Sequence, residues 1–246
     1  MKRIKSFPKK MLCTDLDGTF IGNDSSMYEV LRMLDNDSIL LVFSTGRHLP
    51  SVETFINEKG IRKPDACILM VGTEIYLLSK GKFVLDKYWS RIISQDWDRE
   101  RIVQLLIDIN ELVQQDEEWQ TKFKLSYFLR KNQDGVLQEV NQRLQRTQIK
   151  ARVIYSGNQF LDLLPLLSGK AEAVKYVADT FKVRTENVVV CGDSGNDLDM
   201  FKAGFRGIIV GNAYAELGNF DGENAYHAIR EYSAGILEGL YHFNFI

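Results

Sequence analysis

Two carboxylates stand one residue apart near the start of the chain, in the stretch KKMLCTDLDGTF. Asp15 and Asp17 directly follow a short apolar run, and Gly18 comes next. Because Asp and Gly are common turn residues, an ordinary acidic turn after a strand would explain the pattern. The alternative is chemical, since paired carboxylates can hold a divalent cation or transfer protons. These residues alone do not decide between the two.

Three further groups of polar residues lie at the ends of apolar runs or at the start of a predicted helix. They are FSTGR with Thr45, Gly46 and Arg47, LSGKAEAV with Lys170, and CGDSGNDLDMF with Asp193, Asn196 and Asp197. Together with the first pair they supply the residue types that phosphate-ester hydrolysis requires. A phosphoryl group spreads negative charge over several oxygens, so its transition state must be stabilised electrostatically.

Carboxylates alone would repel a phosphate, and a divalent cation would reverse that effect. A cation held by Asp15, Asp17 and Asp193 fits the preference of Mg²⁺ for hard oxygen ligands. One carboxylate could then attack phosphorus and form an aspartyl phosphate. A second carboxylate, two residues on, could protonate the departing oxygen and later accept a proton from water. Lys170 would neutralise negative charge, and the Thr45 hydroxyl would hold phosphate oxygens.

These residues need secondary-structure elements that bring them together. Short apolar runs typical of buried parallel strands recur as MLCT, ILLVFS, ACILMV, NVVVCG and GIIVG. Helical patterns lie between some of them, including SVETFINEKG, where Ser51 can cap a helix and Gly60 can end it. This alternation predicts an α/β fold with a mostly parallel sheet. Ligands bind at the carboxyl ends of such strands, where Asp15, Thr45 and Asp193 are expected.

The middle of the chain has a different pattern. DRERIVQLLIDINELV carries an apolar stripe from Ile102 to Val113 that predicts a helix, TKFKLSYFLR alternates as a half-buried strand does, and a second helix is expected around GVLQEVNQRL. ARVIYS and FLDLLP, separated by GNQ, predict a hairpin. We therefore expect a compact α+β insert, the cap, over residues 87–165, with residues 1–86 and 166–246 forming the core.

The ordered set of motifs resembles the haloacid dehalogenase (HAD) superfamily of aspartate-nucleophile phosphotransferases. The match consists of DxDGT, a hydroxyl–Gly pair after a second strand, a Lys, and GDxxND, in that order. The resemblance implies a doubly wound, Rossmann-like core and Mg²⁺ as the cofactor. It also implies that Asp15 is the nucleophile and Asp17 the general acid/base. Asp193 would bind the metal directly, and Asp197 would support it.

Segments along nearly the whole chain resemble the sucrose-phosphatase branch of that superfamily, whose α+β cap of type C2 lies between the second and third motifs. They are VGTEIY, KLSYFL, SGNQFLDLLP, CGDSGNDLDMF and YSAGILEGLYHF. The resemblance implies hydrolysis of a sugar phosphate, with sucrose 6F-phosphate first and mannosylfructose phosphate as an alternative. Plant and cyanobacterial sucrose phosphatases often carry Asn where this chain has Gly18, which leaves strict sucrose specificity open.

Substrate contacts are expected from polar residues near the predicted cleft. They are Gly46, Glu74, Lys124, Ser126, Gln159, Asp162 and Asn196. For several of these a plainer explanation exists: Lys124 and Ser126 could be the exposed face of an edge strand, and Glu74 could cap a turn. Arg47 is expected to have a structural role in the core. Trp89, Trp97 and Trp119 are expected to pack, and QQDEEWQ to form a solvated loop.

Three alternatives to a sucrose phosphatase follow from the same motifs. A broad phosphatase of hexose phosphates or other small metabolites would use the same core. A phosphomutase would need a bisphosphate activator and would transfer phosphate to sugar in preference to water. The third is a non-catalytic subunit associated with a sugar-phosphate glycosyltransferase, although four intact motifs favour an enzyme.

Composition and charge limit the remaining possibilities. The chain has 246 residues, 45% hydrophobic and 26% charged, which suffices for a sizeable core. A formal net charge of −2 gives no reason to expect nucleic acid or an anionic membrane as a partner. No run reaches the roughly 18 apolar residues of a membrane span, and no signal-like segment follows MKRIKSFPKK. Three cysteines in apolar runs are typical of reduced thiols. We expect a cytoplasmic monomer.

Overall fold

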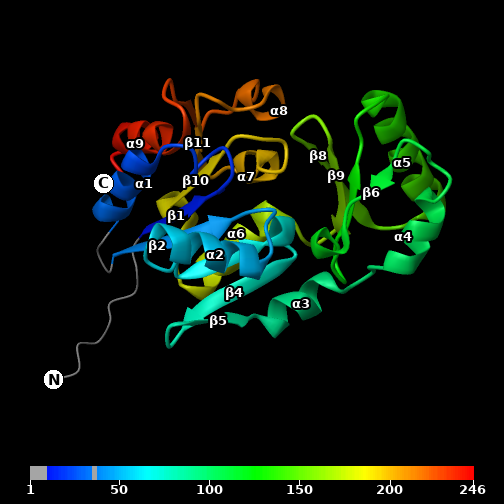
Figure 1. Ribbon diagram of the computed structural model, residues 1–246, viewed down its shortest axis with the longest axis horizontal. Helices are drawn as coiled ribbons and strands as arrows, with labels where there is room; N and C mark the ends of the chain where they lie inside the picture. The colour runs from blue at the N-terminus through cyan, green and yellow to red at the C-terminus, as the bar shows by residue number, and fades with distance from the viewer. Residues whose placement is uncertain (1–9, 35–37) are drawn as a thin grey trace.

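The computed structural model describes residues 10–34 and 38–246 of the chain, so the basic segment 1–9 lies outside the described residues. Two sheets organise the molecule, and Figure 1 shows them side by side. The larger sheet, at the left, has helices on both faces. The smaller sheet, at the right, has α4 (Arg99–Leu106) and α5 (Gln133–Thr147) on its outer side. We call these two parts the core and the cap.

The core sheet is mostly parallel. Its strands among the described residues are, in spatial order, β12 (Ala225–His227), β11 (Arg206–Ile209), β10 (Val188–Gly192), β1 (Lys10–Thr14), β2 (Ile39–Ser44), β3 (Ala66–Leu69), β4 (Glu74–Ser79) and β5 (Lys82–Leu85). Neighbours from β12 to β3 pair in parallel, whereas β4 and β5 are antiparallel additions. The five apolar runs expected as parallel strands all occur, which confirms the predicted α/β class.

Helices cover both faces of this sheet because successive strand residues point to opposite sides. On β1, Leu12 packs in one buried cluster, whereas Met11 and Cys13 belong to another. The first cluster includes residues of α1 (Asp24–Met33), α2 (Leu49–Lys59) and α9 (Tyr232–His242). The second includes residues of α3 (Lys87–Ile93), α6 (Lys170–Thr180), α7 (Leu198–Lys202) and α8 (Ala215–Gly218). The doubly wound architecture is therefore confirmed.

The start of α2 differs from the prediction. His48, not Ser51, is the N-cap, and its ring Nδ1 accepts a hydrogen bond from the Ser51 backbone N–H at 3.2 Å. Pro50 lies in the first turn of the helix, where a residue without an N–H is tolerated, so the helix begins before Ser51. Gly60 ends the helix as predicted, with a φ of 59°.

The cap has its own antiparallel sheet and its own hydrophobic cluster. The strands are, in spatial order, β6 (Val113–Gln114), β7 (Leu125–Phe128), β9 (Phe160–Pro165) and β8 (Ala151–Ser156). Alternate residues of β7 and β9, such as Leu125 and Leu161, pack against α4 and α5 in this cluster. The predicted hairpin and second helix occur. The boundaries at 86/87 and 165/166 stay a prediction.

The first cap helix is shorter than its apolar stripe predicted. It ends at Leu106, and the chain then turns through Ile109 and Leu112 into β6. Ile109 still reaches the cap cluster from this turn, where it is 4% exposed. Ile109 is therefore buried as the stripe predicted although it lies in a turn, whereas Val113 at the end of the stripe is 59% exposed.

Two other features bear on the expectations from sequence. In the part of the chain that the structure describes, no helix is both long and apolar enough to cross a membrane. All three cysteines are free and buried.

Candidate active site

Parallel pairing brings three of the predicted site residues to one edge of the core sheet. Asp15 follows β1, Thr45 follows β2 and Asp193 follows β10. Backbone hydrogen bonds continue the strand pairing one residue further: the Asp15 N–H donates to Cys191 O at 3.0 Å and the Thr45 N–H to Ile68 O at 2.9 Å. These backbone bonds fix where each side chain begins.

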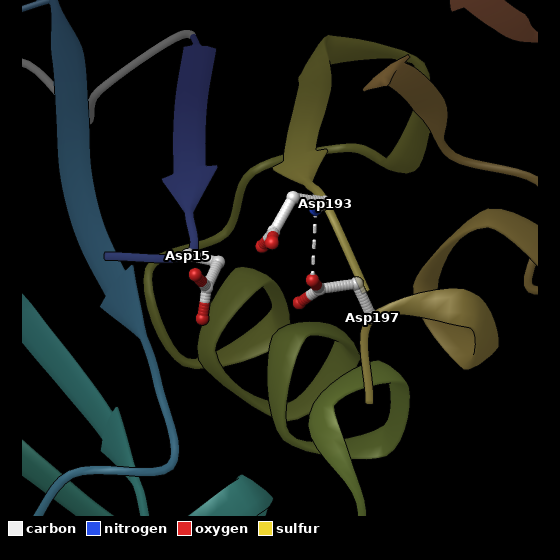
Figure 2. Close-up of side chains that lie close together, drawn as sticks. All are labelled: Asp15, Asp193 and Asp197. Carbon is white, nitrogen blue, oxygen red and sulfur yellow. Dashed lines mark hydrogen bonds between the residues drawn. The ribbon is translucent and has the colours of Figure 1, made fainter. Parts of the chain in front are cut away.

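An acidic cluster lies at this edge. Carboxylate oxygens of Asp15, Asp193 and Asp197 all lie within 4.8 Å of one another, and all three residues are buried. Figure 2 shows the side chains converging beyond the ends of β1 and β10. Asp197 also orders the loop, because its Oδ2 accepts hydrogen bonds from the backbone N–H groups of Asp193 and Ser194 at 3.1 and 3.2 Å.

Among residues 10–34 and 38–246, Lys170 supplies the one ammonium group inside this cluster. Its Nζ lies 2.7 Å from Asp15 Oδ1 and 2.6 Å from Asp197 Oδ1, and its side chain is fully buried. Three carboxylates facing one ammonium leave two negative charges unbalanced when all are ionised. A buried charge needs a partner, so a divalent cation with oxygen ligands fits this donor set. The structure thus assembles three of the four predicted metal ligands with the predicted Lys.

Burial and neighbouring charges shift the pKa values of Asp15, Asp193 and Lys170. Burial, with the nearby Asp197 carboxylate, raises the pKa of Asp193 to about 7. Burial also raises the pKa of Asp15 above its ordinary value, although Lys170 opposes this shift. Burial alone would lower the pKa of Lys170, but Asp15 and Asp197 outweigh it and raise that pKa. The ammonium therefore stays charged, whereas the carboxyl groups of Asp15 and Asp193 favour retaining a proton until a cation arrives.

The backbone before Lys170 runs against another segment of the core. Gly169, with a φ of 109°, precedes α6, and Gly72 lies beside it. A Cβ atom on Gly72 would lie only 2.3 Å from the carbonyl carbon of Gly169. Gly72 itself has a φ of 85°, so both the space and the backbone conformation require glycine there. This close crossing fixes the start of the helix that carries Lys170.

Asp17 does not join the acidic cluster, and its predicted role as a metal-ligating carboxylate is not supported. Its carboxylate instead forms a bidentate ion pair with Arg47, with the Arg47 Nε 2.7 Å from Asp17 Oδ2 and a second bond from Nη2 to Oδ1. The Asp17 side chain is 57% exposed and lines the cavity described below. Arg47 therefore has more than the structural role expected for it, because its guanidinium also orients Asp17, a predicted catalytic group.

The predicted phosphate-binding residues lie around the cluster. Thr45, Gly46 and Asn196 all line the cavity. The Thr45 hydroxyl accepts a hydrogen bond from the Arg47 backbone N–H at 3.2 Å, which leaves its own hydrogen free to donate. The side-chain oxygen of Asn196 is buried and has no protein partner. The Thr45 hydroxyl can therefore donate to a phosphate oxygen, whereas the Asn196 oxygen can only accept and has unused capacity for a donor such as water or a sugar hydroxyl.

A cavity of about 960 Å³ separates the acidic cluster from the cap sheet. Its volume is near the upper end of the range typical for small-molecule sites, about 300–1,000 Å³. The core forms the floor. The cap forms the roof, to which Lys124, Gln159 and Asp162 contribute as predicted. The cavity thus lies between the acidic cluster of the core and a polar sheet face of the cap.

The roof contains a buried ion pair. Lys124 Nζ lies 3.3 Å from Asp162 Oδ1, and the Ser126 hydroxyl donates to the same oxygen at 2.6 Å. Lys124 is 3% exposed and Ser126 fully buried, so an exposed edge face is the wrong explanation for these residues. They alternate with the side chains of the cap cluster and therefore face the core. Ser126 itself does not line the cavity but orients Asp162.

Glu74, like Ser126, does not line the cavity. Its carboxylate accepts a hydrogen bond from the Tyr76 hydroxyl at 3.2 Å, and burial raises its pKa. An antiparallel strand begins at Glu74, so the side chain two residues on lies on the same face and satisfies it. A sugar contact by Glu74 stays a prediction.

Sequence reasoning missed several aromatic and polar residues of the cavity. They are Trp119, Phe128, Arg130, Phe160, Asn212, Tyr214 and Tyr232. Phe128 and Phe160 could have been found, because strand alternation puts them on the same face as Lys124, Ser126 and Asp162.

Trp119 and its loop differ from the prediction. Trp119 lines the cavity, and its carbonyl oxygen accepts a hydrogen bond from Lys124 Nζ at 3.4 Å and lies 3.1 Å from the Ser126 hydroxyl oxygen. The loop QQDEEWQ is therefore not simply solvated, since it supports the roof. Trp89 and Trp97 pack as expected, with their ring N–H groups donating to the backbone carbonyls of Gly72 and Lys122.

Comparison with known proteins agrees with this geometry. A family model described as sucrose-6F-phosphate phosphohydrolase matches residues 8–244. Sucrose-phosphatase 2 of Nicotiana tabacum is 31% identical over 99% of this chain and 61% of its own length. The chain thus spans about three fifths of that plant relative. The mannosylfructose-phosphate phosphatase of Agrobacterium fabrum is 31% identical over 96% of this chain and 97% of its own length.

A solved structure extends the likeness to three dimensions. The sucrose-phosphatase of Synechocystis sp. PCC6803, in complex with sucrose and phosphate, is 30% identical, has a TM-score of 0.91, and covers 97% of this chain and 99% of its own. A HAD subclass IIB sugar phosphatase, BT4131, shares the fold with a TM-score of 0.70 at 16% identity. The chain therefore belongs to the sucrose-6F-phosphate phosphohydrolase family of HAD-like phosphatases.

Proposed function

We propose that the protein is a Mg²⁺-dependent phosphatase that hydrolyses a disaccharide phosphate, with sucrose 6F-phosphate as the first candidate. The observation that carries this proposal is the cavity between two chemically different walls. An acidic, lysine-containing floor suits a phosphoryl group and its cation, and a polar roof suits sugar hydroxyls. Asp15, Asp193 and Asp197 would hold Mg²⁺, which when bound would neutralise charge on the phosphoryl oxygens.

Asp15 is the proposed nucleophile. Lys170 holds one of its oxygens, and the second oxygen attacks phosphorus as the bond to the sugar oxygen breaks. The protonated carboxyl group of Asp17 gives its proton to that departing sugar oxygen. The Asp17 carboxylate next takes a proton from water, whose oxygen attacks phosphorus and releases Asp15. Sugar and inorganic phosphate leave, and both carboxylates return to their starting forms.

Arg47 is proposed to position Asp17 for both proton transfers. Its guanidinium fork fixes the plane of the Asp17 carboxylate at the cavity wall. A carboxyl group that carries a proton is a poorer partner for a guanidinium than a carboxylate is, so protonation would loosen this pair. The loosened Asp17 could then turn toward the leaving oxygen, and the pair would form again after the proton is given up.

One alternative substrate has specific support. The mannosylfructose-phosphate phosphatase is 31% identical to this chain, the same identity as the plant sucrose-phosphatase. Both names describe phosphates of fructose-containing disaccharides. Mannosylfructose phosphate is therefore the second candidate for this site.

A substrate panel tests the proposal. Purified protein would be assayed for phosphate release from sucrose 6F-phosphate, mannosylfructose phosphate, glucose 6-phosphate and fructose 6-phosphate, with Mg²⁺ or with EDTA. We expect a disaccharide phosphate to give the highest kcat/KM, and EDTA to abolish release. Equal rates on all four would indicate a broad phosphatase. Phosphate transfer that depends on a bisphosphate sugar would indicate a mutase, and no release at all would indicate a non-catalytic subunit.

The predicted cytoplasmic location, monomeric state and association with a sugar-phosphate glycosyltransferase go with this proposal. The last two can be measured by sedimentation of the protein alone and with a transferase that makes the same sugar phosphate. A single species at the monomer mass and a faster boundary in the mixture are the expected results.

A further inference from the structure

The loop that carries two carboxylates of the acidic cluster also touches the cap. Gly195 lies between Asp193 and Asp197. The atoms nearest to a Cβ built on Gly195 belong to Tyr155 and Ser156, which end β8 at the tip of the β8–β9 hairpin. A Cβ atom at Gly195 would lie 2.3 Å from the carbonyl oxygen of Tyr155 and 3.4 Å from the Cα of Ser156. Both atoms are backbone, so they cannot turn aside as a flexible side chain could.

The backbone conformation of Gly195 does not itself require glycine. Its φ lies outside the left-handed region, so an alanine could adopt it. The obstacle to a side chain at this position therefore comes from the cap and would vanish if the cap moved away. In this respect Gly195 differs from Gly72, whose φ is 85° and whose neighbours belong to the core.

A second contact with the core lies in the turn of the same hairpin, at Asn158. The Asn158 backbone N–H donates to the carboxylate of Glu216 on α8, at 3.3 Å. The neighbouring Gly157 and Gln159 line the cavity. From the same hairpin, β9 runs on to Asp162 in the roof. The hairpin tip therefore meets the core at two points beside the cavity, and its position sets the height of the roof.

We propose that Gly195 is the docking point on which the cap closes, and that its missing side chain positions the roof for a disaccharide phosphate. This inference rests on the proposed function, because it concerns the sugar part of the same substrate. An added methyl group would separate hairpin and loop and so disfavour the closed arrangement. Lys124 and Asp162 would then lie too far from the sugar, while the phosphate floor would keep its geometry.

A crosslinking experiment tests the docking without any substrate. The three native cysteines are buried, so an engineered pair, Asn158→Cys with Glu216→Cys, would report contact between hairpin and core. We expect its rate of disulfide formation to fall about tenfold when Gly195→Ala is added, the range in which overpacking by one methyl group falls. An unchanged rate would overturn the proposal.

Gly218→Ala is the matched control for that measurement. Gly218 also lacks a positive φ, lies on the same helix as Glu216, and its added Cβ would meet nothing closer than Ala213 O at 3.6 Å. This variant should crosslink at the rate of the parent pair. Far-ultraviolet circular dichroism and the thermal unfolding midpoint would establish that each variant is folded.

A kinetic experiment separates docking from damage to the metal-binding loop. In the otherwise native chain, Gly195→Ala should raise the KM for sucrose 6F-phosphate about tenfold and change kcat/KM for p-nitrophenyl phosphate less than about twofold. Glu216→Ala, which removes the second contact, should act in the same direction with a smaller effect. Equal losses on both substrates would contradict the proposal. If the native protein does not hydrolyse disaccharide phosphates, the proposed function is wrong. The crosslinking result would still show whether the hairpin docks at Gly195.

Discussion

The floor and the roof of the cavity differ in whether their buried charges are balanced. In the floor, three buried carboxylates face one ammonium group, so two negative charges lack a partner. In the roof, Lys124 and Asp162 balance each other, and the Ser126 hydroxyl satisfies the same carboxylate. An unbalanced site favours binding of further ions, whereas a balanced one offers hydrogen bonds to neutral groups. This difference supports the proposed binding of phosphate and cation at the floor and of sugar hydroxyls at the roof.

The largest effect is expected from removing the nucleophile in the floor. Asp15→Asn should lower kcat by about four orders of magnitude or more on every substrate, as loss of a nucleophile does elsewhere. The fold should stay intact, because the amide still accepts a hydrogen bond from Lys170. Phosphate release from both sucrose 6F-phosphate and p-nitrophenyl phosphate measures this. Asp24→Asn, at an exposed pair with Lys59, is the control. Residual turnover near that of the native chain would refute the nucleophile assignment.

The next largest effect should arise in the roof and depend on the substrate. Lys124→Ala should raise the KM for the disaccharide phosphate on the order of tenfold to a hundredfold, with little change for p-nitrophenyl phosphate. It should also lower the free energy of unfolding by about 3 kcal/mol, since Asp162 would be buried without its partner. Lys122→Ala, on an exposed side chain of the same segment, should do neither. Similar losses on both substrates would mean that the roof does not contact sugar.

A smaller, substrate-independent effect is expected at the floor's edge. Arg47→Ala should lower kcat about tenfold on all substrates, because Asp17 would lose its orientation but not its chemistry. Arg47→Lys should restore only part of the rate, since an ammonium cannot form the bidentate pair. If only the KM for disaccharide phosphates changed, Arg47 would belong functionally to the roof.

The smallest effect concerns stability and pH. Because burial raises the pKa of Asp193 to about 7 and also raises that of Asp15, the folded metal-free protein retains protons that the unfolded chain releases. Their contribution to stability is therefore complete at low pH and declines as pH rises toward 7. The urea midpoint measured with EDTA should fall from pH 5 to pH 8, and Mg²⁺ should restore it most at pH 8. Asp193→Asn should flatten this dependence. A midpoint that rises with pH would contradict the charge imbalance.

Sequence predicted the floor better than the roof, for physical reasons. Asp15, Thr45 and Asp193 directly follow buried strands, and parallel pairing forces such positions together, so their convergence could be inferred from apolar runs alone. The pairing of Asp17 with Arg47 could not, because it depends on which way two side chains turn after their strands end. The order of the motifs along the chain predicts where the backbone of each lies, whereas the side-chain rotamers determine which residues pair.

The roof depends on details that periodicity does not record. Alternation correctly separated Lys124 and Ser126 from the side chains that pack in the cap cluster but could not say whether their side faced water or another part of the protein. Trp119 lies in a short loop with no periodic pattern, so its place in the cavity had no sequence signal. The early end of α4 at Leu106 was missed because the turn that follows still buries Ile109, so the apolar spacing resembles that of a longer helix.

The crossing of Gly72 with Gly169 bears on how members of this family could exchange caps by recombination. A cap taken from another member and joined to the core near α3 and after β9 can supply its own roof residues. The segment that follows β9 must still pass Gly72, where there is no space for a side chain. Chimeras that keep both glycines and join the chains before residue 169 should fold with the host's lysine in place. Junctions at this crossing should misplace the helix that bears it, whichever sugar the new roof prefers.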